Sequence, residues 1–181
     1  PADVYVSGFD FSAPAKLSDV HPETRKLELG KTEVIRWKST EGFEVEGVLV
    51  KPVGYVQGER YPLMTVAHGG PTGAHHDYYR VRYGDGGQHW AGQGWAVLYP
   101  NPRGSTNYGE RFMRGNLADW GGGDYRDIMA GVNELSSRDY IDEDRIALHG
   151  SSYGGYMGSW IVGHETRFKA AIVGAPCANL H

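Results

Sequence analysis

A serine between closely spaced glycines is the feature of this sequence that most clearly indicates chemistry. Residues 148–157 read LHGSSYGGYM, and only Ser152 in that stretch has glycine both two residues before it and two residues after it. The G-x-S-x-G pattern is typical of a nucleophile elbow, in which a serine stands at the tip of a sharp turn between a strand and a helix. We therefore predict that Ser152 is a catalytic nucleophile and that Ser151 fills the variable position.

The glycines around Ser152 have a steric reason. A side chain at Gly150 or Gly154 would collide with the crossing backbone of the turn, and Gly155 lets the next helix begin close to the strand. That helix would direct its unpaired N–H groups and the positive end of its dipole at the reacting centre. The alternative is a glycine-rich turn with an incidental serine, because the pattern also occurs by chance.

Acyl transfer at a serine needs hydrogen-bond donors for the oxyanion that forms. In α/β-hydrolases one donor is the backbone N–H of the residue after the nucleophile, which is Tyr153 in this sequence. Another comes from a loop after an earlier strand, often rich in glycine and containing histidine. The stretch His68-Gly69-Gly70-Pro71 follows a short apolar run and fits that description. The alternative is an ordinary loop that contains a histidine.

These loops need a sheet to hold them, and the sequence predicts one. Short apolar runs bounded by turn residues indicate buried parallel strands, and they lie at 63–67, 95–99, 145–148 and 168–174. Helices are predicted between these strands at 85–93, 124–136 and 156–162, and Asp124 is the expected cap of the second. Alternating runs predict a hairpin at 33–38 and 43–50 and edge strands at 3–6 and 16–20. The strand–helix alternation predicts an α/β fold with a mostly parallel sheet.

Composition excludes several other functions. The 181 residues carry a net charge of −4 without a basic run, so nucleic acid is not an expected partner. No apolar run reaches the length of a membrane span. Cys177, the single cysteine, excludes an internal disulfide and is predicted to be a small buried residue. His75-His76-Asp77 lacks metal-ligand spacing and is predicted to be a solvated loop, so we expect no metal and no cofactor.

The partners of a serine triad are missing from the sequence after Ser152. That part of the chain has no Asp, and its only acid, Glu165, is expected to end the helix and point away from the serine. We therefore predict that the chain is truncated before the catalytic Asp and His, and that the segment alone is nearly inactive. A first residue that is not Met also suggests a fragment.

Four motifs in this order resemble the prolyl oligopeptidase family of serine peptidases, and especially its acylaminoacyl peptidases and related bacterial oligopeptidases. The resemblance covers residues 31–181 and continues upstream. The motifs are HGGP at 68–71, NPRGSTNYG at 101–109, Trp120-Gly121 with Asp124 and Asp127, and GSSYGGYM at 150–157. Asp124 and Asp127 themselves are interpreted as the N-terminal part of a helix rather than as paired catalytic carboxylates.

The resemblance implies an α/β-hydrolase domain joined to a β-propeller. Residues 1–28 would be the end of the propeller and a linker, and residues 29–181 the truncated catalytic domain. Ser152 would be acylated, while Tyr153 and Gly70 would give the backbone oxyanion donors. His68 belongs to the oxyanion loop and stands where prolyl oligopeptidases and dipeptidyl peptidases carry a tyrosine, which favours the acylaminoacyl branch.

The expected function is that of a serine peptidase that cleaves short or N-acylated peptides through an acyl-enzyme. Its expected partners are peptide substrates and the remainder of its own chain, in a cytoplasmic location, with homo-oligomerisation left open. Two alternatives remain at this stage: a carboxylesterase of the same fold, which a propeller-like start disfavours, and a noncatalytic fragment that binds a partner.

Overall fold

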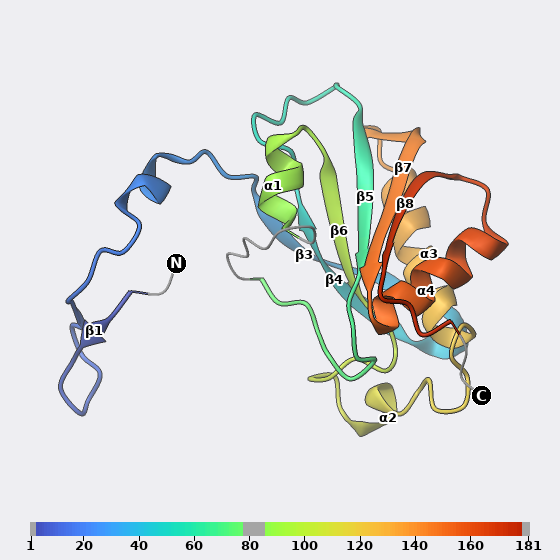
Figure 1. Cartoon of the computed structure of the whole chain (residues 1–181), viewed down its shortest axis with the longest axis horizontal. Coiled ribbons are helices and arrows are strands. Elements are labelled where there is room, and N and C mark those ends of the chain that lie inside the picture. Colours follow the sequence, from blue (N-terminus) through green and yellow to red (C-terminus); the bar gives the residue numbers. More distant parts are fainter. Residues whose placement is uncertain (1–2, 78–85, 179–181) are drawn as a thin grey trace.

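A single six-stranded sheet forms the centre of the computed structural model, which describes residues 3–77 and 86–178 (Figure 1). The strand order is β3-β4-β6-β5-β7-β8. β3 and β4 form the predicted antiparallel hairpin, and β6, β5, β7 and β8 are parallel to one another. The strands are β3 Thr32–Lys38, β4 Glu44–Val50, β5 Tyr61–Ala67, β6 Ala96–Asn101, β7 Ile141–Ser151 and β8 Phe168–Gly174.

Helices cover both faces of this sheet, as the strand–helix alternation predicts. α1 packs on one face, while α3 and α4 lie on the other (Figure 1). The helices are α1 Gly87–Gly92, α2 Glu110–Met113, α3 Gly123–Ser136 and α4 Tyr153–His164, with 3-10 turns η1 Pro22–Lys26 and η2 Thr40–Gly42. Residue 85, where the first helix is predicted to begin, lies outside the described residues. No helix in the described part of the chain has the length and apolar character to cross a membrane.

Alternation along the strands separates two apolar layers. Leu63 and Leu98 face α3 and α4, whereas their neighbours Met64 and Val97 face α1. The layer under α3 and α4 is the larger of the two, and it includes Met157 of the nucleophile helix. The elbow therefore rests on the main core of the molecule.

Residues 3–29 lie apart from this core. β1 (Tyr5–Val6) pairs with β2 (Ala15–Lys16) in a two-residue ladder that is shorter than the predicted edge strands. Phe9 and Phe11 are fully or almost fully exposed, and the segment extends away from the sheet (Figure 1). Gly30 is the first buried residue in the described part of the chain, and it exchanges two hydrogen bonds with the side chain of Gln88 in α1.

Two local predictions are wrong. Asp124 does not cap α3: the helix is preceded by Gly122, and Asp119 accepts the N–H of Gly123 at 2.8 Å, which leaves Asp124 inside the first turn. Cys177 is exposed rather than buried. The reason is its position after β8, which is the outermost strand of the sheet and is itself largely exposed.

Candidate active site

Ser152 occupies the tip of a sharp turn between β7 and α4. Its backbone has φ 60° and ψ −123°, a conformation that residues with a side chain rarely adopt. Its N–H donates to the carbonyl of Gly174 at 3.0 Å, and its carbonyl accepts the N–H of Tyr156 at 2.9 Å, so both sides of the turn are fixed. Ser152 is exposed, and its hydroxyl is therefore open to a substrate.

At each of the three glycines of the elbow, an added side chain would collide with a backbone carbonyl. A Cβ at Gly150 would lie 2.1 Å from the carbonyl oxygen of Gly154. A Cβ at Gly154 would lie 2.2 Å from that of Ala67, and one at Gly155 would lie 2.3 Å from that of Gly174. These separations are far inside van der Waals contact, so the predicted steric reason for glycine is confirmed at each position.

The loop after β5 reaches the nucleophile. β5 and β7 are parallel neighbours in which Ala67 pairs with Gly150, so their carboxyl ends leave the sheet together. A Cβ at Gly69 would lie 3.5 Å from Cβ of Ser152 and 4.0 Å from its Oγ. Gly70 has φ 133°, and a side chain there would meet the backbone of Thr72 at 2.6 Å. The predicted oxyanion loop and the predicted nucleophile are therefore adjacent.

The N–H of Tyr153 opens helix α4. The first N–H groups of a helix have no partner within the helix, and they carry its positive end. The loop that contains Gly69 lies beside Ser152. Backbone N–H donors stabilise the oxyanion of a tetrahedral acyl intermediate.

The side chain of His68 connects the loop after β5 with the loop after β6. Its Nε2 lies 2.9 Å from Oγ of Ser105, and its Nδ1 lies 2.8 Å from the carbonyl oxygen of Gly69. A second bond joins the same two loops, because Thr106 N–H donates to the carbonyl of Gly73 at 3.0 Å. The loop after β6 therefore supports the loop after β5.

The loop after β6 is held by a group here called the loop network, which consists of Arg103, Asp127 and Glu41. Nε and Nη2 of Arg103 donate to the two carboxylate oxygens of Asp127 at 2.9 Å each, and the Arg103 backbone N–H donates to the same group at 2.8 Å. Arg103 also donates to Glu41 at 2.8 Å and lies over the ring of Phe43. Arg103 and Asp127 are almost completely buried. Sequence reasoning missed this pair.

A second buried group, the elbow network, consists of Tyr153, Asp124 and Asn116. The Tyr153 hydroxyl donates to Asp124, and the Asn116 amide donates to both, at 3.3 Å each. The Asp124 carboxylate also accepts the N–H groups of Gly121 and Tyr125. Burial raises the pKa of Asp124 in spite of these donors, and burial next to Asp124 raises the pKa of Tyr153.

The interpretation of Asp124 and Asp127 as an ordinary helix start is incomplete. Asp124 lies in the first turn of α3 and Asp127 one turn further along, but both side chains are fully buried. The signal in the sequence was their spacing of three residues in a segment that also supplies apolar residues to the core. Such spacing puts both carboxylates on one helix face.

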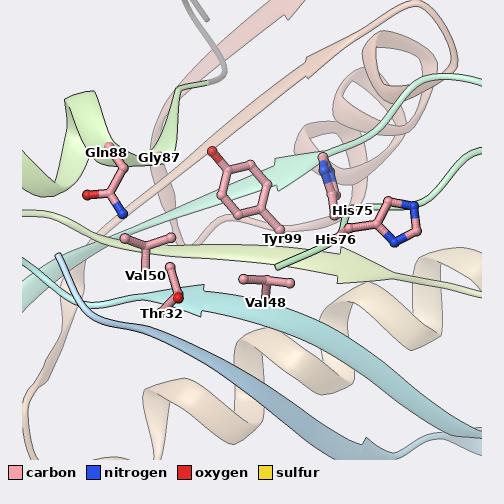
Figure 2. Close-up of a pocket in the computed structure, with 8 residues that line it drawn as sticks. All are labelled: Thr32, Val48, Val50, His75, His76, Gly87, Gln88 and Tyr99. Atoms are coloured by element: carbon pink, nitrogen blue, oxygen red, sulfur yellow. The ribbon is translucent and has the colours of Figure 1, made fainter. Parts of the chain in front are cut away.

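His75 corrects another expectation. It is buried rather than part of a solvated loop, and its ring packs on Tyr99 at 4.6 Å. Both residues line a cavity of about 20 Å³ on the α1 face of the sheet. Figure 2 shows their rings together with Gly87 and Gln88 of α1. Within residues 3–77 and 86–178 no group of three or more His, Cys, Asp and Glu side chains could hold a metal ion.

Glu165 follows the last residue of α4, so the length of that helix separates it from Ser152. Its carboxylate accepts the hydroxyl of Tyr125 at 2.8 Å and pairs with Arg167. The expectation that Glu165 points away from the serine agrees with this position. His164 contacts Trp160, and His181 lies outside the described residues.

Comparison with known proteins agrees with this arrangement. Residues 85–181, more than half of the chain, match the model of the prolyl oligopeptidase family. An uncharacterized peptidase, YuxL, of Bacillus subtilis (strain 168) is 41% identical over 156 residues, which are 86% of this chain and 23% of the relative. Dipeptidyl-peptidase 5 of Schizosaccharomyces pombe is 37% identical over 143 residues, 77% of this chain and 21% of the relative.

The fold is also that of a solved peptidase. An acylaminoacyl peptidase in complex with Z-Gly-Gly-Phe-chloromethyl ketone superposes on 96% of this chain and 28% of its own, with a TM-score of 0.83 and 33% identity. The chain thus spans less than a third of the length of these relatives. The catalytic part of an α/β-hydrolase sheet, the elbow and the matched family model lead to one conclusion: this chain belongs to the prolyl oligopeptidase family.

Proposed function

We propose that the protein carrying this chain is a serine peptidase of the acylaminoacyl or oligopeptidase type, with Ser152 as its nucleophile. The observation that carries the proposal is the strained, exposed Ser152 at the start of α4, with Gly69 beside its side chain. Family membership supports hydrolysis of peptides as the reaction class.

In the proposed reaction Oγ of Ser152 attacks the carbonyl carbon of the scissile peptide bond. A general base takes the hydroxyl proton, and the carbonyl oxygen becomes an oxyanion held by the N–H groups of Tyr153 and Gly70. The C–N bond then breaks, and the proton goes to the leaving amine. Water, activated by the same base, releases the acyl group and restores the serine. The proposal assigns the base and its carboxylate partner to sequence outside these 181 residues.

Short or N-acylated peptides are the proposed substrates. The similar acylaminoacyl peptidase binds a chloromethyl ketone whose peptide has a blocked N-terminus. The relatives named dipeptidyl-peptidase 5 favour a second candidate, the removal of dipeptides from a free N-terminus. His68 at the start of the oxyanion loop supports the first candidate, because the resemblance puts tyrosine there in dipeptidyl peptidases.

We also propose a domain boundary at residues 28–29. The exposed Phe9 and Phe11 support it, because large apolar side chains left in water indicate a surface that another unit covers. The two hydrogen bonds between the backbone of Gly30 and the side chain of Gln88 also support this boundary, because contact with the hydrolase domain begins at Gly30. The proposed unit before the boundary is the end of a β-propeller from the same chain.

Labelling tests the nucleophile. A fluorophosphonate probe applied to the full-length protein, followed by peptide mass spectrometry, should modify Ser152. S152A should lose labelling and peptide hydrolysis, whereas the matched control S151A should keep both. Modification elsewhere, or an active S152A, would overturn the proposal.

Substrate pairs test the finer assignment. Hydrolysis of N-acetyl-alanine p-nitroanilide should exceed that of alanyl-alanine p-nitroanilide, which has a free N-terminus. The reverse order would favour the dipeptidyl-peptidase candidate. Turnover of p-nitrophenyl esters without any of the anilides would favour a carboxylesterase.

A further inference from the structure

Two buried carboxylates near the start of α3 connect to the two segments that lie beside Ser152. Asp124 and Asp127 are three residues apart, so they lie on one helix face, and both are fully buried. Neither has a place in the acyl-transfer steps above. Their partners, however, lead to the two proposed oxyanion donors by separate routes.

The first route is short. Asp124 accepts the hydroxyl of Tyr153, the residue whose backbone N–H is the proposed donor next to the nucleophile. The ring of Tyr153 is buried and packs edge-on against Trp120 at 4.9 Å. The side chain of Tyr153 is therefore held at its ring and at its hydroxyl, and Asp124 contributes to the placement of the residue that carries this N–H.

The second route runs through two loops. Asp127 accepts the backbone N–H and the guanidinium of Arg103, which fixes the loop after β6. Ser105 of that loop contacts Nε2 of His68 at 2.9 Å, and His68 begins the loop that carries Gly70. A displacement of Arg103 would therefore shift the Gly70 side of the oxyanion site.

We propose that Asp124 and Asp127 are positioning residues, and that the N-terminal part of α3 is a common support for both oxyanion donors. The inference rests on the proposed function of Ser152. It assigns to α3 a task beyond covering the sheet, because one helix would position two donors from different segments, the start of α4 and the loop after β5, relative to each other. Small errors in such placement are costly, because a misplacement of about 1 Å can lower a rate about a hundred-fold.

The elbow route is tested with a matched pair of hydroxyl deletions in the full-length protein. Tyr153→Phe removes the hydrogen bond from the Tyr153 hydroxyl to Asp124. Tyr125→Phe removes the same kind of bond, from a tyrosine hydroxyl to the carboxylate of Glu165, at a site away from the nucleophile. We expect Tyr153→Phe to lower kcat per titrated active site about ten-fold with KM changed less than about three-fold, and Tyr125→Phe to leave both unchanged.

The loop route has its own pair. Asp127→Asn weakens the hold on Arg103, while Asp119→Asn changes a carboxylate that accepts the N–H of Gly123 at the start of the same helix. We expect a loss in kcat of about ten-fold for Asp127→Asn and none for Asp119→Asn. Asp124→Asn serves as the second variant for the elbow route if Tyr153→Phe folds poorly.

A transition-state analogue separates positioning from plain support of the fold. The inhibition constant of a peptide trifluoromethyl ketone, whose adduct carries an oxyanion, should rise by the same factor by which kcat falls. Unchanged kcat per titrated site and unchanged inhibitor affinity in Tyr153→Phe, Asp124→Asn and Asp127→Asn would overturn the inference, as would equal losses in the two controls. If the wild-type protein is not labelled at Ser152, the proposed function itself fails instead.

Discussion

The elbow network and the loop network each contain a buried carboxylate from the N-terminal part of α3, but the two carboxylates have different kinds of hydrogen-bond donor. Asp127 faces a guanidinium that donates to both of its oxygens. Asp124 faces only neutral donors, namely a phenol, an amide and backbone N–H groups. Both carboxylates are completely buried, so the difference between them lies in the partner and not in the exposure.

The two networks should respond differently to substitutions that remove a charge and to those that remove a hydrogen bond. A guanidinium supplies a full positive charge, and two parallel hydrogen bonds fix its plane. Neutral donors stabilise a buried negative charge less, and the pKa of Asp124 is accordingly raised by burial. The loop network should therefore depend on charge, and the elbow network on hydrogen bonds. The predictions below separate these two dependencies by measurements on the full-length protein.

The largest effect is expected for Arg103→Met. The variant leaves Asp127 buried without its charged partner, which typically costs about 3–5 kcal/mol. The free energy of unfolding from urea denaturation should fall by about that amount. The control is Arg126→Met, because Arg126 also pairs with Glu41 but is well exposed, and its loss should cost less than about 1 kcal/mol. Similar losses in both variants would contradict the charge dependence of the loop network.

A smaller loss is expected for Tyr153→Phe. It removes one hydrogen bond to a buried carboxylate, an interaction worth about 1.5–3 kcal/mol, and it leaves the ring and its packing against Trp120 in place. Urea denaturation of this variant beside Tyr125→Phe measures the difference. A loss no larger than that of Tyr125→Phe, whose hydroxyl is less buried, would show that Asp124 does not depend on the phenol.

The sequence predictions that are confirmed depend on patterns among residues close together in the chain. Apolar runs gave the four parallel strands, and glycine spacing around Ser152 gave the elbow, because sterics at a sharp turn act between residues close in the chain. The loop at His68–Gly70 followed from the α/β-hydrolase pattern, in which a loop after an earlier strand supplies the second oxyanion donor. Its adjacency to the elbow comes from the pairing of β5 with β7, which the structure shows.

Side-chain contacts between segments far apart in the sequence could not be predicted from apolar periodicity or glycine spacing. Arg103 and Asp127 are 24 residues apart, and Asp124 and Tyr153 are 29 apart. Each of these residues reads in sequence as a loop or helix-end residue, which is where charged and polar side chains usually lie. Cys177 failed for the opposite reason: small apolar residues are usually buried, but burial needs a covering element, and β8 is the outermost strand.

The pH dependence of stability gives a finer test of the elbow network. The pKa of Asp124 is raised in the folded protein from its ordinary value of 3.8, so the folded state holds this proton more tightly than the unfolded state. Its contribution is therefore greatest below that value and is lost as the pH rises through the raised pKa. Asp124→Asn lacks this loss. The stability of Asp124→Asn relative to wild type should rise from about pH 4 upward and then level off. A constant difference between the two urea denaturation series would contradict the raised pKa.

The smallest effect is expected at the exposed end of the loop network. Glu41 accepts a bond from Arg103 at 2.8 Å, but its own side chain is 58% exposed, and water screens its charge. Glu41→Gln keeps the shape and an acceptor oxygen, so the free energy of unfolding should change by less than about 1 kcal/mol. The buried carboxylate of Asp127 then carries nearly all of the compensation of the Arg103 charge. If Glu41→Gln were as destabilising as Asp127→Asn, the positive charge would be shared between the surface and the interior, and the sharp contrast between the two networks would be lost.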